Sequence, residues 1–87
     1  MFYVYLLKSL RDGRYYIGQT QDVVHRLKCH NSGLVLSTRS RRPFVLVGVE
    51  KFWTRNDARW FEYSLKEHGD KKKRFIKKMQ EKVASGS

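Results

Sequence analysis

The segment Phe2 to Lys8 constrains the fold most, because it is apolar at both alternating positions of a β-strand. A strand that is apolar on both faces is usually covered on both. The segment therefore predicts the central strand of a small sheet, with helices packed against it. In that strand one face carries Tyr3, Tyr5 and Leu7, and the other carries Phe2, Val4 and Leu6.

Two further strands are expected beside the central one. Arg14 to Ile17 follows a turn at Asp12 and Gly13, and glycine accepts the positive φ that such turns need. This arrangement predicts an antiparallel hairpin. Phe44 to Phe52 predicts a third strand, because it is strongly hydrophobic and follows the basic loop that stops at Pro43.

The segment after the hairpin predicts a first helix. Thr20 is the expected N-cap, because its hydroxyl can accept a hydrogen bond from a free backbone N–H. We expect the helix to run to about Asn31 and to end at Gly33. At about 100° per residue, Arg26 and His30 lie one turn apart along one edge of the buried stripe. That stripe is expected to contain Val23, Val24 and Leu27.

Two more helices are expected after the third strand. Thr54 or Asn56 caps the first of them and Gly69 ends it. Glu62 falls about 60° from Leu65 around this helix, so its carboxylate borders the core. The apolar residues expected to face the core are Ala58, Phe61 and Leu65 in this helix, and Phe75, Ile76, Met79 and Val83 in the Lys-rich last helix.

The predicted fold class is α/β in the broad sense, more narrowly α+β, with element order ββαβαα and a small three-stranded antiparallel sheet flanked by helices. The 87 residues suffice for one core. We expect a single domain over residues 1–83 and an unstructured end at 84–87.

The balance of charge points to a polyanionic partner. Nineteen Lys and Arg residues against eight Asp and Glu residues give a net charge of +11, which favours nucleic acid. The longest apolar runs are far shorter than the roughly 20 residues that span a bilayer, so no membrane partner is expected. Cys29 is the single cysteine, and no secretory leader is evident, so we expect a cytoplasmic protein.

Two basic segments are candidates for contact with phosphates. The alternative is that the second segment is only a solvated helix face, but the net charge of +11 favours a phosphate-binding surface made by both. The chain contains no recognised base-reading motif, so binding independent of sequence is expected. The candidate residues are Arg39, Arg41 and Arg42 in the loop, and Lys71, Lys72, Lys73 and Arg74 in the helix.

A set of short motifs follows one another along the chain at compatible spacings. Tyr5 lies in the first strand, Tyr16-Ile17-Gly18 ends the second, Arg26 and His30 share the first helix, and Glu62 lies in the second helix. This succession resembles the GIY-YIG nuclease domain over about residues 2–66. It is most similar to small stand-alone members related to the amino-terminal nuclease domain of the bacterial excinuclease.

Two departures from the family pattern are visible. The first element is Tyr3-Val4-Tyr5, without its glycine, and residues 65–80 contain no asparagine after the acidic residue.

The resemblance implies a Mg²⁺ (or Mn²⁺) dependent DNA endonuclease with catalytic residues Tyr5, Tyr16, Arg26, His30 and Glu62. Glu62 would be the metal ligand, and Gly18 belongs to the structural motif. These residue types suit phosphodiester hydrolysis, since Arg26 can bind non-bridging oxygens and a tyrosine with a lowered pKa can accept a proton from water. The resemblance also favours a role in DNA repair or recombination.

Other interpretations of these residues stay open. The tyrosines could be packing residues, Arg26 could form a surface ion pair, and Glu62 could pair with Lys66. His30 could relay a proton, contact phosphate or only favour the end of its helix. A zinc site at Asp22, His25 and Cys29 is less favoured, because no fourth ligand is evident.

The alternative function is a nucleic-acid-binding module that keeps the nuclease fold but has little activity alone. A larger protein partner could then supply the choice of target, and RNA remains open as the ligand.

Overall fold

The computed structural model describes residues 1–85, and the side chains of residues 1–82. The predicted order of elements is confirmed, with one short 3₁₀ turn added. The elements are β1 (Phe2–Ser9), β2 (Tyr15–Thr20), α1 (Val23–Ser32), the 3₁₀ turn (Arg39–Arg41), β3 (Phe44–Phe52), α2 (Arg55–Glu67) and α3 (Gly69–Ser85).

The three strands form one antiparallel sheet in the order β2-β1-β3. β1 is therefore central, as its two apolar faces predict. Tyr5 pairs with Gly18 of β2 on one side and with Val49 of β3 on the other. The register against β3 shifts between Leu6 and Leu7, where the ladder is irregular.

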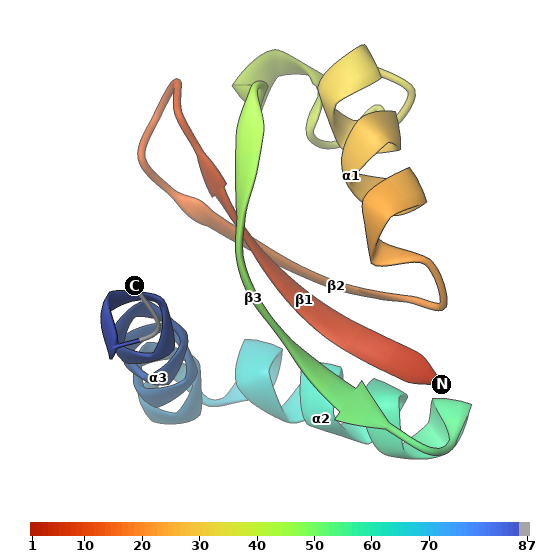
Figure 1. Cartoon of the computed structure of the whole chain (residues 1–87), viewed down its shortest axis with the longest axis vertical. Coiled ribbons are helices and arrows are strands. Elements are labelled where there is room, and N and C mark those ends of the chain that lie inside the picture. The colour runs from red at the N-terminus through yellow and green to blue at the C-terminus, as the bar shows by residue number, and fades with distance from the viewer. Residues whose placement is uncertain (86–87) are drawn as a thin grey trace.

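Helices cover both faces of this sheet (Figure 1), and each face has its own hydrophobic cluster. Alternation along β1 sends successive side chains to opposite faces, as expected. The face under α1 buries Tyr5, Leu7 and Phe44. The face under α2 and α3 buries Val4, Leu6, Ile17, Ala58, Leu65, Phe75 and Met79.

The N-terminus of α1 corrects the sequence prediction. Thr20 does not cap the helix, because it still belongs to β2 and pairs with Tyr3. Asp22 is the N-cap, and its carboxylate accepts a hydrogen bond from the His25 N–H at 3.0 Å. The predicted end at Gly33 is confirmed: this residue has φ 83°, and its N–H contacts the last carbonyls of the helix.

The buried stripe of α1 also differs from the prediction. Val23 and Leu27 pack against the core as expected, but Val24 is 66% exposed. His30, expected at the edge of the stripe, is fully buried. The stripe therefore runs along Val23, Leu27 and His30, which recur at the i, i+4, i+7 spacing of one helix face.

The junction between α2 and α3 contains a second correction. Thr54 caps α2 as predicted, with its hydroxyl accepting from the Asp57 N–H at 3.1 Å. However, α2 ends at His68, and Gly69 is the first residue of α3 rather than the end of α2. His68 ends α2 in an extended conformation, so the chain turns there without a left-handed glycine.

The loop before β3 is fastened to the hairpin turn. The hydroxyl of Ser9 donates to the carbonyl of Arg41, and Leu10 N–H donates to the carbonyl of Pro43 at 2.8 Å. The peptide bond between Arg42 and Pro43 is cis. The hairpin and the basic loop therefore form one continuous end of the molecule.

In the described part of the chain no helix is long and apolar enough to cross a membrane. The domain boundary predicted at residue 83 stays a prediction. Helix α3 extends to Ser85, whereas Gly86, Ser87 and the side chain of Val83 lie outside the described residues.

Candidate active site

Tyr5 and Gly18 face each other across the β1-β2 hairpin. A Cβ atom on Gly18 would lie less than 3.0 Å from the Tyr5 phenol, closer than real contacts allow. Glycine at this position therefore leaves the space that the tyrosine ring occupies. This is the structural role predicted for Gly18.

His30 connects Tyr5 to the loop before β3. Its Nε2 lies 2.9 Å from the Tyr5 hydroxyl, and its Nδ1 lies 2.8 Å from the hydroxyl of Thr38. Thr38 is fully buried and donates in turn to the carbonyl of Val35 at 3.4 Å. Since that carbonyl can only accept, Thr38 accepts from Nδ1–H, and Nε2 is left to accept the Tyr5 proton.

Aromatic rings surround this hydrogen-bonded chain. The centre of the His30 ring lies 5.0 Å from that of Tyr16 and 5.8 Å from that of Phe44. The rings of Tyr5 and Tyr16 are 6.3 Å apart. Three sequence-predicted residues, Tyr5, Tyr16 and His30, are thus in one cluster on the α1 face of the sheet.

Arg26 lies beside the same cluster. Its interaction with the Tyr5 phenol is the main factor that raises the pKa of the guanidinium. Its Nε is buried and has no hydrogen-bond partner among the described residues. A buried donor without a partner costs about 1–3 kcal/mol, so the fold alone does not explain this placement.

The protonation states of His30 and Tyr5 follow from burial. Burial, and then the charge of Arg26, lower the pKa of His30 below its ordinary 6.5, so the imidazole is neutral near pH 7. Burial raises the pKa of Tyr5 above 10.0, although hydrogen bonding to Arg26 lowers it. The expected lowering of the Tyr5 pKa is therefore wrong as a net effect, because desolvation outweighs the guanidinium.

Glu62 approaches this cluster from α2. Its side chain is 18% exposed, at the margin of the core as predicted, and its charge raises the pKa of Tyr5. One carboxylate oxygen also accepts from Lys66 Nζ at 3.0 Å, so the alternative ion pair is present. A surface pair of this kind contributes at most about 1 kcal/mol, and it does not prevent the carboxylate from binding a cation.

The donor set fits a water-rich cation rather than a closed metal centre. Among the described residues there is no group of three His, Cys, Asp or Glu side chains that could hold a metal. Asp22 is occupied as the α1 cap, and Cys29 Sγ contacts His25 Nε2 at 3.5 Å, so the zinc interpretation gains no support. Mg²⁺ commonly keeps several waters and needs only one or two carboxylates, which Glu62 can supply.

The three arginines of the basic loop make structural contacts. Arg39 Nε donates to the Gly33 carbonyl at 2.9 Å, and the Arg42 guanidinium covers the same glycine. Arg41 Nε forms an ion pair with Asp12 at 2.9 Å. Arg41 nevertheless lines a hollow of about 710 Å³ whose other basic residues are Arg14, Lys72 and Lys73.

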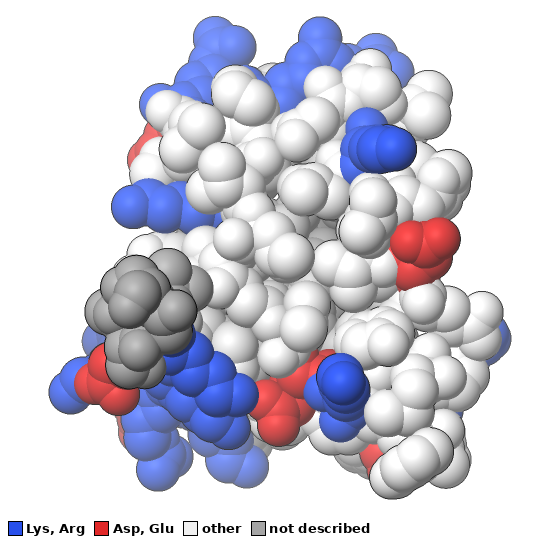
Figure 2. All heavy atoms as spheres, viewed as in Figure 1, with Lys and Arg blue, Asp and Glu red and all other residues white. Residues whose placement is uncertain are grey.

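The basic residues of α3 extend that surface. Figure 2 shows Lys and Arg side chains gathered over α3 and around the loop before β3. Lys71 and Arg74 line a different, shallower hollow with Lys78, between α2 and α3. The structure thus brings Arg41 together with Lys72 and Lys73, but not with Lys71 and Arg74.

Two residues of the site were not identified from the sequence. Thr38 fixes the His30 ring, and Asn31 holds the start of β3 through two bonds with the backbone of Phe44, at 3.0 and 2.6 Å. Both stand next to predicted residues, but a threonine in a loop and an asparagine near a helix end have too many ordinary roles to be recognised alone.

Comparison with known proteins shows the family. The model of the GIY-YIG catalytic domain matches residues 1–77. The chain is 42% identical over 72 residues to the UPF0213 protein BH0048 of Halalkalibacterium halodurans, covering 82% of this chain and 76% of that protein. It is 44% identical over 72 residues to a UPF0213 protein of Bacillus pumilus, covering 82% and 72%.

A solved structure agrees with these sequence relatives. The solution NMR structure of the UPF0213 protein BH0048 from Bacillus halodurans matches with a TM-score of 0.55 and 38% identity, over 92% of this chain and 86% of that chain. The chain therefore belongs to the GIY-YIG family. This membership confirms the predicted resemblance to small stand-alone members of the family.

Proposed function

We propose that this chain is a Mg²⁺-dependent endonuclease that hydrolyses DNA phosphodiester bonds, with a role in DNA repair or recombination. The observation that carries the proposal is the cluster of Tyr5, Tyr16, Arg26 and His30, with the charge of Glu62 acting on it from α2. Residues from both sides of the sheet act on one phenol. Such convergence of titratable groups is typical of catalytic sites.

Arg26 is proposed to bind the phosphate that is attacked. Its planar, permanently charged guanidinium matches the non-bridging oxygens, on which negative charge grows in the transition state. A Mg²⁺ ion bound at Glu62 supplies positive charge for the leaving 3′ oxygen. The two cationic groups then stand on opposite sides of the reacting phosphate.

A tyrosine is proposed to accept the proton of the attacking water. Tyr5 can take that proton while it passes its own to Nε2 of His30, so no tyrosinate has to form against its raised pKa. The neutral state of His30 leaves Nε2 free to receive the proton. Tyr16, next to the same imidazole, is the alternative acceptor.

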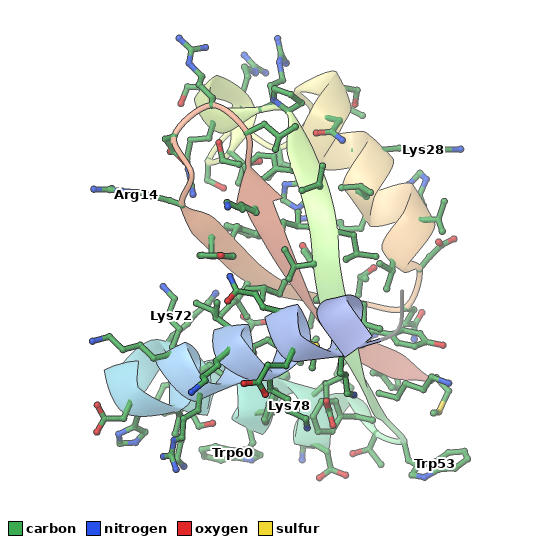
Figure 3. The ribbon with its side chains drawn as sticks, turned by 60° about the vertical axis from the view of Figure 1, so that its left-hand side comes forward. Arg14, Lys28, Trp53, Trp60, Lys72 and Lys78 are labelled. Atoms are coloured by element: carbon green, nitrogen blue, oxygen red, sulfur yellow. The ribbon has the colours of Figure 1, made fainter. Side chains whose placement is uncertain are left out.

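The proposed DNA-binding surface includes the hollow lined by Arg14, Arg41, Lys72 and Lys73. Figure 3 shows Arg14 and Lys72 projecting from the same side of the molecule, whereas Lys28 points away from the opposite side. Lys71, Arg74, Arg39 and Arg42 are proposed to extend this surface.

The test is nicking of supercoiled plasmid by the wild type and by Glu62→Gln, with Mg²⁺ or with a chelator. The wild type should nick only with Mg²⁺, and Glu62→Gln should not nick while it keeps its affinity for DNA. Lys66→Gln is the control, because it removes the ion pair but leaves the carboxylate. Undiminished nicking by Glu62→Gln would exclude the metal-ligand role.

A binding module with little activity alone is the second candidate. It is favoured by the ion pair that holds Glu62 to Lys66. In that case the wild type should bind DNA without nicking it, and a larger protein partner would be needed for cleavage.

A further inference from the structure

Both tryptophans of the chain lie on its surface. Trp53 is 83% exposed, Trp60 is 67% exposed, and Tyr63 is 56% exposed. Large aromatic side chains are usually mostly buried, and the core uses the opposite side of α2, where Ala58 and Leu65 lie. Exposed aromatic groups of this size commonly mark binding surfaces.

Trp60 and Tyr63 form part of a shallow hollow on the outer face of α2. Their ring centres are 5.9 Å apart and their planes are nearly perpendicular, at 88°, so the pair is arranged edge to face. The hollow has a volume of about 300 Å³ and is also lined by Asn56 and Arg59. These four residues recur at i, i+3, i+4 and i+7, which places them on one helix face.

A second hollow continues from the first towards the candidate active site. Arg59 lines both, and the second, of about 580 Å³, also contains Arg55 and reaches Gln19 and Thr20 at the end of β2. Gln19 directly follows Gly18, the partner of Tyr5. Arg59 also precedes Glu62 by three residues, so the two are neighbours on the surface of α2.

We propose that the outer face of α2 binds unpaired nucleotides of the substrate. A base stacks on the rings of Trp60 and Tyr63, while Arg59 and Arg55 hold the following phosphates and lead the strand to the active site. Base stacking on exposed aromatic rings, beside basic side chains that follow the backbone, is how single-stranded nucleic acid is commonly bound. The inference rests on the proposed function only in taking this strand to be part of the substrate.

Charge favours nucleic acid over an apolar protein segment as the occupant. The aromatic hollow carries Arg59 and Asn56, an amide that can both donate and accept with a base edge. Arg55 in the second hollow lies 5.5 Å from the Phe2 ring centre. The carboxylate in that hollow, Asp22, is already bonded to the backbone of α1.

The test measures binding to a labelled 12-nucleotide oligothymidylate in the presence of a chelator, so that cleavage plays no part. Trp60→Ala should weaken this affinity by about tenfold or more, because stacking of one base is lost. Trp60→Phe should keep most of it, since an aromatic face remains. Affinity for a blunt duplex should change little in either variant.

Trp53→Ala is the matched control. Trp53 is also an exposed tryptophan, and Figure 3 shows it on the same outer edge of the molecule as Trp60, but it lines neither hollow. Its removal should leave oligothymidylate affinity nearly unchanged. All variants should melt close to the wild type, because the exposed rings contribute little to the core.

Unchanged oligothymidylate affinity in both Trp60→Ala and Tyr63→Ala would overturn the proposal and would favour a protein partner for this face. Equal losses for oligothymidylate and duplex would also overturn it, because stacking on unpaired bases would not be involved. Failure of the proposed function has a different signature: the wild type would bind oligothymidylate by way of Trp60 and yet cleave no DNA with Mg²⁺.

Discussion

At the scale of single residues, the Tyr5 ring depends on the missing side chain of Gly18. We expect Gly18→Ala to displace the phenol, because the new Cβ would overlap it. The free energy of unfolding should fall by about 1–3 kcal/mol, the usual cost of overpacking, and cleavage should fall with it. Gly69→Ala is the control, since nothing lies within 4 Å of its Cβ position. Equal stability of the two variants in chemical denaturation would contradict this role for Gly18.

His30 should make stability depend on pH in a defined direction. Its pKa is lowered in the folded state, so below about pH 6.5 the unfolded chain binds a proton that the folded chain does not. The free energy of unfolding should therefore be fully supported above pH 6.5 and should decrease as the pH falls towards the folded pKa. Denaturation at pH 7.5, 6.5 and 5.5 measures this slope.

The variant His30→Gln should flatten that slope, because no ionisable group remains at the site. His25→Gln, an exposed change on the same helix, is the control and should leave the slope as in the wild type. If His30→Gln kept the full dependence on pH, another group would be responsible.

At the scale of elements, Asn31 joins the end of α1 to the start of β3. Its amide donates to the carbonyl of Phe44 and accepts from the Phe44 N–H, as a neighbouring strand would. Asn31→Ala should lower the free energy of unfolding by about 1–3 kcal/mol, because both backbone groups lose a partner. Thermal melting beside Ser32→Ala, which loses one bond within the helix, checks this. A loss no larger than that of the control would contradict the linking role.

The elements also show what the sequence can and cannot predict. The strands were predicted well, because both apolar faces of β1 and the turn at Gly13 are local signals. The start of α1 was missed, since pairing of Thr20 with Tyr3 extends β2 and moves the cap to Asp22. Burial of His30 was missed because it depends on Thr38, which comes from a loop eight residues later.

The candidate site follows the same division. The family motifs located Tyr5, Tyr16, Arg26, His30 and Glu62, but their spacing does not determine protonation. The raised pKa of Tyr5 arises mainly from burial, which only the packed structure determines. Likewise, the contacts of Arg39 and Arg42 with Gly33 were not visible in the pattern of charge.

At the scale of the whole molecule, the net charge of +11 predicts how DNA affinity responds to salt. Affinity for a duplex should fall steeply with salt, by a logarithmic slope of about −0.9 for each phosphate contacted, and should vary little with sequence. Replacing both Lys72 and Lys73 by Ala should make the slope shallower by roughly one to two phosphates.

The matched control for that variant replaces both Lys28 and Lys51 by Ala. It removes the same charge from positions outside the hollow that Lys72 and Lys73 line. Titrations at several salt concentrations should give it nearly the wild-type slope. Equal slopes for the two double variants would mean that the basic surface acts only through total charge.

The cluster under α1 is proposed to perform phosphodiester hydrolysis, and Arg26→Ala tests this role most directly. The measurement is the rate of plasmid nicking with Mg²⁺ under single-turnover conditions, with the melting temperature of the same sample and Lys28→Ala as the control on the same helix. We predict that Arg26→Ala loses cleavage by a factor of at least about 10² while it stays folded, because the guanidinium acts on charge that develops in the transition state. Lys28→Ala should cleave like the wild type. Nicking by folded Arg26→Ala at the wild-type rate would contradict the proposed role of the cluster.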